Sequence, residues 1–151
     1  MENNVRVLPP EVLMEPLLDL VREGKEVPLL ISGNSMSPFL VHGRDTVYLR
    51  KISERPKKGD IILYRRNSGE YILHRVFKAE ANSFSFVGDA QSYIEKGIRE
   101  DQLLAVVKTV RHKGKVITSG SFWWEFFEKM WINMVPLRAI AVALYTKLRR
   151  K

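Results

Sequence analysis

The chain has 151 residues and no cysteine, is 45% hydrophobic and 28% charged, and carries a formal net charge of +8. This length and balance predict one compact globular domain and argue against wholesale disorder. The lack of cysteine excludes disulfides, a thiol nucleophile and a cysteine metal site, although it indicates no particular compartment. With only three histidines, we expect neither a metal centre nor any other cofactor.

The positive charge is concentrated at the C-terminal end. Residues 129–151 hold six basic residues and no acid, which leaves 19 Lys and Arg against 17 Asp and Glu in residues 1–128. A basic tail attracts phospholipid headgroups as readily as nucleic acid. Because the remainder of the chain is almost neutral, we do not expect a nucleic-acid partner.

No targeting or membrane-spanning segment is expected. Residues 1–24 carry acids throughout and lack the basic and then apolar pattern of a signal peptide. The longest uncharged stretches near the C-terminus, Met130–Leu137 and Ala139–Thr146, have eight residues each. A spanning helix needs about 20 mostly apolar residues.

Apolar spacing divides the chain into three zones. A helical lead, residues 1–26, contains a predicted helix over Pro10–Glu23 that Gly24 ends. Its apolar positions are Val12, Leu13, Leu17, Leu20 and Val21. A β-rich domain, residues 27–119, and a helical tail, residues 120–151, follow.

The β-rich zone contains seven short runs of β-branched and aromatic residues, with no helical pattern between them. The turn Asn67-Ser68-Gly69 joins two of the runs as a hairpin. We therefore expect a mainly β fold, a small antiparallel or mixed sheet that curls into a partly barrel-like form. The runs are 27–32, 45–52, 60–66, 70–79, 83–88, 103–112 and 115–119.

The tail is predicted to form two amphipathic helices, one before and one after Pro136. All three tryptophans lie in Phe122–Trp131, and the chain ends Lys147-Leu-Arg-Arg-Lys. Aromatic rings and cations in this order suit a bilayer surface, so residues 122–151 are expected to hold the protein on a membrane. The alternative is that both helices dock on the β-rich domain and complete its core.

One turn carries residue types suited to nucleophilic chemistry. In Ile31–Leu40, with the sequence ISGNSMSPFL, Ser35 has Gly33 two residues before it and Pro38 three residues after it. An irregular turn of this kind can expose a hydroxyl and direct backbone N–H groups at an oxyanion. Taken alone, the same residues also fit an ordinary loop.

Five segments in order make the pattern specific. Together they resemble the superfamily that joins type I signal peptidases to the LexA-type repressor proteases, over roughly the central 60–80 residues. The resemblance implies the fold of that superfamily and a serine peptidase activity. The segments are SGNSMSPFL (32–40), GRDTV (43–47), KGDII (58–62), LHRV (73–76) and VGDA (87–90).

The resemblance implies that Ser35 is the nucleophile and His74 the general base, as in the endoplasmic-reticulum and archaeal type of signal peptidase, which pairs Ser with His. An imidazole has an ordinary pKa near 6.5, so it demands less of its surroundings than a lysine base. Asp89 is the candidate to orient His74, although Asp89 and Asp60 also fit simple turns. Lys78 is a rival base, but lies about 13 Å from His74 along the strand.

Two positions depart from the signal-peptidase pattern. Gly33 stands where those enzymes commonly carry a serine, and Ala90 ends the segment where the family pattern has Asn. We therefore expect the oxyanion hole to consist of the N–H groups of Asn34 and Ser35. The substrate is expected to contact Ser32, Gly33, Met36 and Leu73.

The leading hypothesis is a serine endopeptidase that cleaves an extended peptide or precursor protein after small residues. A peptide-binding or maturation-partner module that does not cut is the alternative. A LexA-type self-cleaving regulator fits less well, because only 34 residues precede Ser35 and no alanine occurs before Ala79. We expect a peripheral membrane protein, with an accessory membrane subunit as another anchor and a cytoplasmic location as the alternative.

Overall fold

The computed structural model describes residues 10–150 and begins with helix α1 (Pro10–Arg22), which confirms the expected N-terminal helix. Its buried face consists of Met14, Leu18 and Val21, which pack into the main core, whereas Val12 and Leu13 of the predicted apolar stripe are exposed. The spacing of four and three residues between the buried positions keeps them on one side of the helix. Of the other apolar residues in the predicted stripe, Leu17 is partly buried against the same core and Leu20 is exposed.

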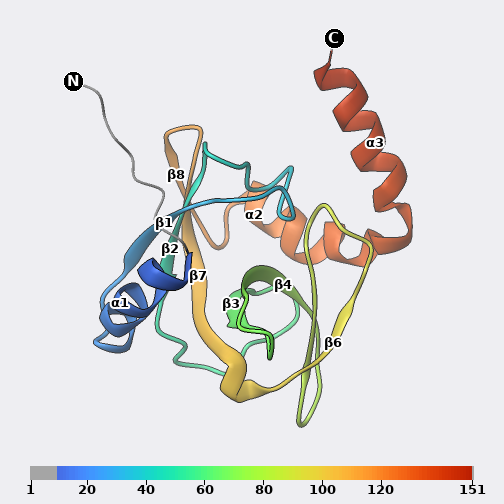
Figure 1. Cartoon of the computed structure of the whole chain (residues 1–151). Helices are drawn as coiled ribbons and strands as arrows, with labels where there is room; N and C mark the ends of the chain where they lie inside the picture. The colour runs from blue at the N-terminus through green and yellow to red at the C-terminus, as the bar shows by residue number, and fades with distance from the viewer. Residues whose placement is uncertain (1–9, 151) are drawn as a thin grey trace, which may run out of the picture.

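The main structural unit is an antiparallel sheet of eight strands (Figure 1). The strands pair in the order β1-β2-β7-β3-β4-β5-β6, and β8 pairs with β7. The sheet is curled but not closed, which confirms the mainly β fold class. The strands are β1 (Val27–Leu30), β2 (Thr46–Arg50), β3 (Ile61–Arg65), β4 (Tyr71–Ala79), β5 (Phe84–Val87), β6 (Glu95–Ile98), β7 (Leu103–His112) and β8 (Lys115–Thr118).

Strand β6 was not predicted, whereas the other seven strands match the seven runs. Its sequence Glu-Lys-Gly-Ile has only one apolar residue and a glycine at positive φ. It pairs with β5 at only two positions, Phe84 with Ile98 and Phe86 with Glu95, across an irregularity. A short polar strand on an irregular ladder leaves no alternating pattern in the sequence.

The sheet separates two cores, and strand β3 contributes to both. Ile61 and Leu63 face the core that also contains Phe39 and α1, while Ile62 and Tyr64 face a second core built around β4 and β5. In the antiparallel register of β3 and β4, Ile61 is opposite Arg75 and Ile62 is opposite His74. Consecutive residues on a strand point to opposite faces. His74 and Arg75 therefore point into different cores.

The tail forms a helical turn α2 (Phe122–Glu125), a π-helical turn η2 (Phe126–Met130), a 3₁₀ segment η3 (Trp131–Leu137) and helix α3 (Arg138–Arg149). A single regular helix before Pro136 was expected, but the helical type changes at Phe126 and the backbone kinks at Met134. Three aromatic side chains of this first part, Trp124, Phe127 and Trp131, are buried in the main core.

Helix α3 projects away from the sheet (Figure 1). Four of the large apolar side chains around it are exposed, Leu137, Ile140, Leu144 and Leu148. The first part of the tail therefore completes the core, as the docking alternative expected, whereas Ile140, Leu144 and Leu148 of α3 stay exposed. Among the helices in residues 10–150, none has the length and apolar composition needed to cross a bilayer.

Candidate active site

The loop between β1 and β2 presents Ser35. The serine is half-buried at the start of a turn, above the buried side chain of Met36. The Ser35 carbonyl accepts a hydrogen bond of 2.9 Å from the N–H of Ala90, and the N–H of Gly33 donates to His42 Nδ1 at 2.8 Å. His42 was not expected to have a role at the site, but its ring nitrogen holds Gly33, two residues before Ser35.

Ser35 and His74 line the same cleft, which has a volume of about 120 Å³. One wall comes from the segment after β1 and the other from the start of β4. The cleft thus brings together Ser35, His74 and all four residues expected to contact substrate, whereas Asn34 and Asp89 do not line it. The full lining is Ile31, Ser32, Gly33, Ser35, Met36, Tyr71, Ile72, Leu73 and His74.

Because Gly88 has no side chain, the Ser35 backbone and the His74 ring can both lie close to the turn that contains it. A Cβ atom at this position would lie 2.5 Å from the Ser35 carbonyl oxygen and 3.1 Å from His74 Nε2. Both separations are shorter than ordinary carbon contacts, so a side chain here would push the loops apart. His74 Nε2 therefore faces the turn that holds the Ser35 backbone.

His74 is 5% exposed on β4, and its environment favours the neutral imidazole. Burial lowers the pKa of His74 from 6.5 to about 4, an effect that the carboxylate of Glu95 partly opposes and the charge of Arg66 increases. An uncharged imidazole at neutral pH has a lone pair available to accept a proton. The histidine is thus in the protonation state that a general base requires.

Asp89 lies elsewhere, which corrects the expectation that it orients His74. Its two carboxylate oxygens accept hydrogen bonds from Nη2 and Nε of Arg75 at 2.9 and 3.0 Å. Both side chains are fully buried, and Arg75 Nη1 also donates to the Gly59 carbonyl at 2.8 Å. Because Arg75 and His74 point to opposite faces of β4, a carboxylate paired with Arg75 is not a partner of the imidazole.

Asp60 and Lys78 also lie away from the chemistry of the cleft. Asp60 accepts a hydrogen bond from the N–H of Lys57 and forms an ion pair with Lys108. It is therefore a turn-forming residue. Lys78 is exposed and pairs with Glu80 at 3.2 Å. The structure therefore places His74 in the cleft and places the rival lysine outside it.

The tail supports the turn 88–91 behind the cleft. Trp131 Nε1 donates to the Asp89 carbonyl at 2.7 Å, and Arg138 Nη1 donates to the carbonyls of Gly88 and Gln91 at 2.9 and 3.1 Å. Arg138 is only 1% exposed. This buried role was not predicted, although an arginine between two uncharged apolar stretches is a sequence signal for one.

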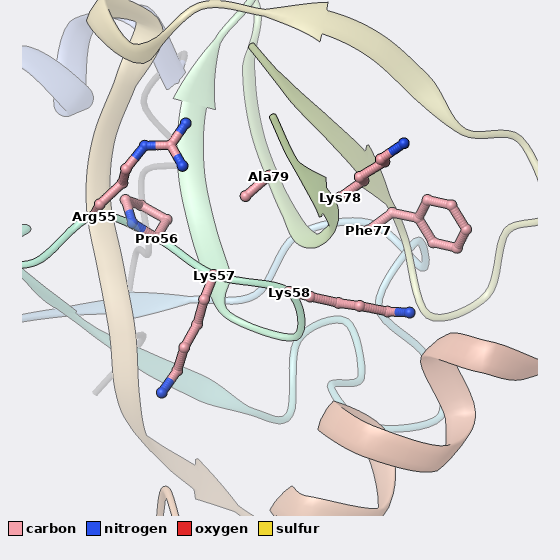
Figure 2. Close-up of a pocket in the computed structure, with 7 residues that line it drawn as sticks. All are labelled: Arg55, Pro56, Lys57, Lys58, Phe77, Lys78 and Ala79. Carbon is pink, nitrogen blue, oxygen red and sulfur yellow. The ribbon is translucent and has the colours of Figure 1, made fainter. Parts of the chain in front are cut away.

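A larger hollow of about 580 Å³ lies apart from the cleft and is lined by Arg55, Lys57, Lys58, Phe77 and Lys78 together with Pro56 and Ala79. Figure 2 shows that its cationic ends point in different directions. Lys58 donates to Asn133, and Arg55 donates to the Glu80 carbonyl. The cations do not converge on one point, so this hollow is not assigned as an anion site. Within residues 10–150 no three His, Asp or Glu side chains gather as a metal site would require.

Comparison with known proteins gives one match. A model of the family described as Peptidase S24-like matches residues 8–117. This range contains all five motif segments and both sides of the cleft, and ends before the tail residues that support the turn 88–91. No curated protein and no solved structure shows significant similarity to the chain.

The contacts of Asp89 predict a structural role. Asp89→Asn leaves Arg75 buried without its counter-charge, so the variant should lose about 3–5 kcal/mol of unfolding free energy in urea denaturation. Asp101→Asn is the matched control, because Asp101 pairs with Arg99 on the surface and such pairs contribute only about 0–1 kcal/mol. An Asp89→Asn protein of unchanged stability would contradict the assignment.

Proposed function

Because the chain belongs to the Peptidase S24-like family, within the superfamily of LexA-type and signal-peptidase-type serine peptidases, we propose that it is a serine endopeptidase with Ser35 as nucleophile and His74 as general base. The observation that carries this proposal is the shared cleft, in which the serine lies with a histidine whose pKa is lowered to about 4. A serine hydroxyl becomes a useful nucleophile only when a neighbour accepts its proton.

In the proposed mechanism, His74 Nε2 accepts the proton of Ser35 Oγ as the oxygen attacks the carbonyl carbon of the scissile bond. The protonated imidazole then gives that proton to the leaving amine, and the C–N bond breaks. Water attacks the acyl-enzyme with His74 again as base, which releases the acid and restores the serine. Each step needs only the proton that the imidazole takes up and returns.

The oxyanion is proposed to bind the backbone N–H of Ser35, which lines the cleft, together with the N–H of the preceding residue Asn34, which lies next to the lining residues Gly33 and Ser35 in the chain. Within residues 10–150 neither group has a recorded hydrogen-bond acceptor, whereas the neighbouring N–H of Gly33 is bound to His42. Preorganised backbone donors of this kind stabilise the charge that develops in the transition state. Their availability supports an oxyanion hole that needs no serine hydroxyl at position 33.

The shape of the cleft supports an extended substrate with small side chains near the cut. Its walls are the chain segments 31–33 and 71–73, so a peptide between them would pair with extended backbone on its edges. The space beside Ser35 is about 120 Å³ and is lined partly by Ile31, Met36 and Leu73. A space of this size favours alanine-sized residues over bulky ones.

Helix α3 supports a second part of the proposal, namely that the protein binds the surface of an anionic membrane. Its exposed apolar side chains Leu137, Ile140, Leu144 and Leu148 follow helical spacing. Residues 129–151 contain six basic residues and no acid. Arg138 is one of the six and is buried, so the other five are the ones that complement a negatively charged surface. Bound in this way, α3 would hold the cleft near membrane-associated precursors.

Peptide cleavage tests the enzymatic proposal. Purified protein, with and without mild detergent, should cleave precursor-like peptides that carry Ala-x-Ala sites after the small residue, and mass spectrometry identifies the products. Ser35→Ala and His74→Gln should each lose at least about a hundredfold in rate, since general base catalysis contributes at least that much. Ser37→Ala is the matched control for a hydroxyl in the same loop and should retain activity.

The alternative is a peptide-binding module of the same fold. In that case every peptide would stay intact, while wild type and Ser35→Ala would bind the peptide equally well in a fluorescence anisotropy titration. Products that form equally with Ser35→Ala would overturn the assignment of the nucleophile.

The pH dependence tests the environment of His74. A base with a lowered pKa loses its proton at lower pH, so kcat/KM should rise through about pH 4 and be level by about pH 6. The free enzyme is the species that this profile reports. Circular dichroism at each pH shows whether the fold persists in the acid range. A midpoint at the ordinary imidazole value of 6.5 would contradict a buried base.

Vesicle flotation tests the role of α3. The full chain should float with phosphatidylglycerol vesicles and much less with phosphatidylcholine vesicles, and high salt should weaken binding because it screens the charges. Ile140→Asp with Leu144→Asp should abolish flotation, whereas Val116→Asp, at an exposed position on β8, should not. Flotation of the double variant equal to wild type, or a dimer that only the double variant disrupts, would overturn the membrane assignment.

A further inference from the structure

The side of His74 opposite the cleft contains a chain of polar contacts that the sequence analysis did not anticipate. His74 Nδ1 lies 3.5 Å from the hydroxyl oxygen of Tyr64, and this hydroxyl donates to Glu95 Oε1 at 2.6 Å. Arg66 Nε in turn donates to Glu95 Oε2 at 2.7 Å. The chain thus runs from the imidazole through a phenol and a carboxylate to a guanidinium.

The number of protons on each group determines which one donates in the contacts of Tyr64 with Glu95 and His74. A phenol has a single proton, and the short contact to Glu95 shows where this proton lies. A carboxylate in an ion pair accepts such a proton more strongly than a neutral ring does, and Glu95 forms an ion pair with Arg66. The Tyr64 oxygen can therefore offer His74 only a lone pair. To use it, Nδ1 must carry hydrogen.

The tautomer that results is the one that catalysis requires. A neutral imidazole carries hydrogen on one nitrogen only, so a proton on Nδ1 leaves a free lone pair on Nε2. The Nε2 atom faces the turn at Gly88 that binds the Ser35 backbone. The distance of 3.5 Å is long for a hydrogen bond, and contacts of this kind tighten when the base becomes charged during reaction.

We propose that Tyr64 and Glu95 are positioning residues that fix the tautomer and the ring orientation of His74, the role that the sequence analysis gave to Asp89. The proposal rests on the proposed function for its catalytic meaning, but the tautomer can be measured without any substrate. The role of the Tyr64 hydroxyl can be tested separately from the packing of its ring, which stacks on Phe86 with centroids 4.2 Å apart. Tyr64→Phe removes only the hydroxyl and keeps this contact.

Long-range ¹H–¹⁵N NMR correlations of the full ¹⁵N-labelled chain at neutral pH test the proposal. With three histidines in the sequence, His42→Gln and His112→Gln identify the His74 signals. The wild type should show His74 protonated at Nδ1. Tyr64→Phe removes the acceptor, and Glu95→Ala removes the carboxylate that binds the phenol proton, which can then point at the ring. Both variants should therefore shift the population toward the form protonated at Nε2.

Two control variants separate this role from general damage. Glu70→Gln removes the other carboxylate bound to Arg66, and Tyr48→Phe removes a hydroxyl from β2 that contacts Arg111. Both should leave the His74 tautomer unchanged. A wild-type His74 protonated at Nε2, or a tautomer that Tyr64→Phe does not alter, would overturn the proposal.

Kinetics add an independent readout. Tyr64→Phe should lower kcat roughly ten- to a hundredfold with little change in KM, because the base is misoriented for part of the time while the peptide site is intact. An unchanged kcat would overturn the positioning role. If no peptide is cleaved by the wild type while the tautomer responds as expected, the enzymatic proposal fails and the assignment of Tyr64 and Glu95 to His74 remains.

Discussion

The buried ion pair between Arg75 and Asp89 is the interaction on which the arrangement of the cleft depends. Both side chains are fully buried and joined by two hydrogen bonds, with the guanidinium 5.2 Å from the centre of the Phe39 ring. The pair holds the turn 88–91 against β4, and the N–H of Ala90 in this turn binds the Ser35 carbonyl. The loop that carries Ser35 and the strand that carries His74 are therefore fixed to each other through this ion pair.

A second arginine supports the same turn from the opposite end of the sequence. Arg138 binds the carbonyls of Gly88 and Gln91, and Trp131 binds that of Asp89. Trp131 and Arg138 lie beyond the range that matches the family, which ends at residue 117. The tail thus supports the cleft, and Arg138, which binds the turn, is also the first residue of helix α3.

Most of the strands and the pairing of Ser35 with His74 in one cleft could be predicted from the sequence, whereas the polar partners of His74 could not. Alternation identified seven strands, and the motif order placed Ser35 and His74 together, because both signals are local or linear. Asp89 was assigned to the wrong partner, since its position in the motif could not show which face of β4 its carboxylate would reach. Glu95 was missed because β6 is too short and polar to be recognised, and its contact with Tyr64 exists only after the sheet has curled.

Burial of His74 explains why an orienting group is needed at all. The dry environment keeps the imidazole neutral, as a base requires, but it also removes the water that would otherwise satisfy Nδ1. Without a partner, a buried ring nitrogen costs the same free energy in either orientation of the ring. Burial alone therefore does not select the orientation in which Nε2 points toward Ser35. The phenol of Tyr64 supplies a fixed acceptor at Nδ1, and its proton is committed to Glu95. The same apolar core that lowers the pKa of His74 therefore also contains the polar contact proposed to orient its ring.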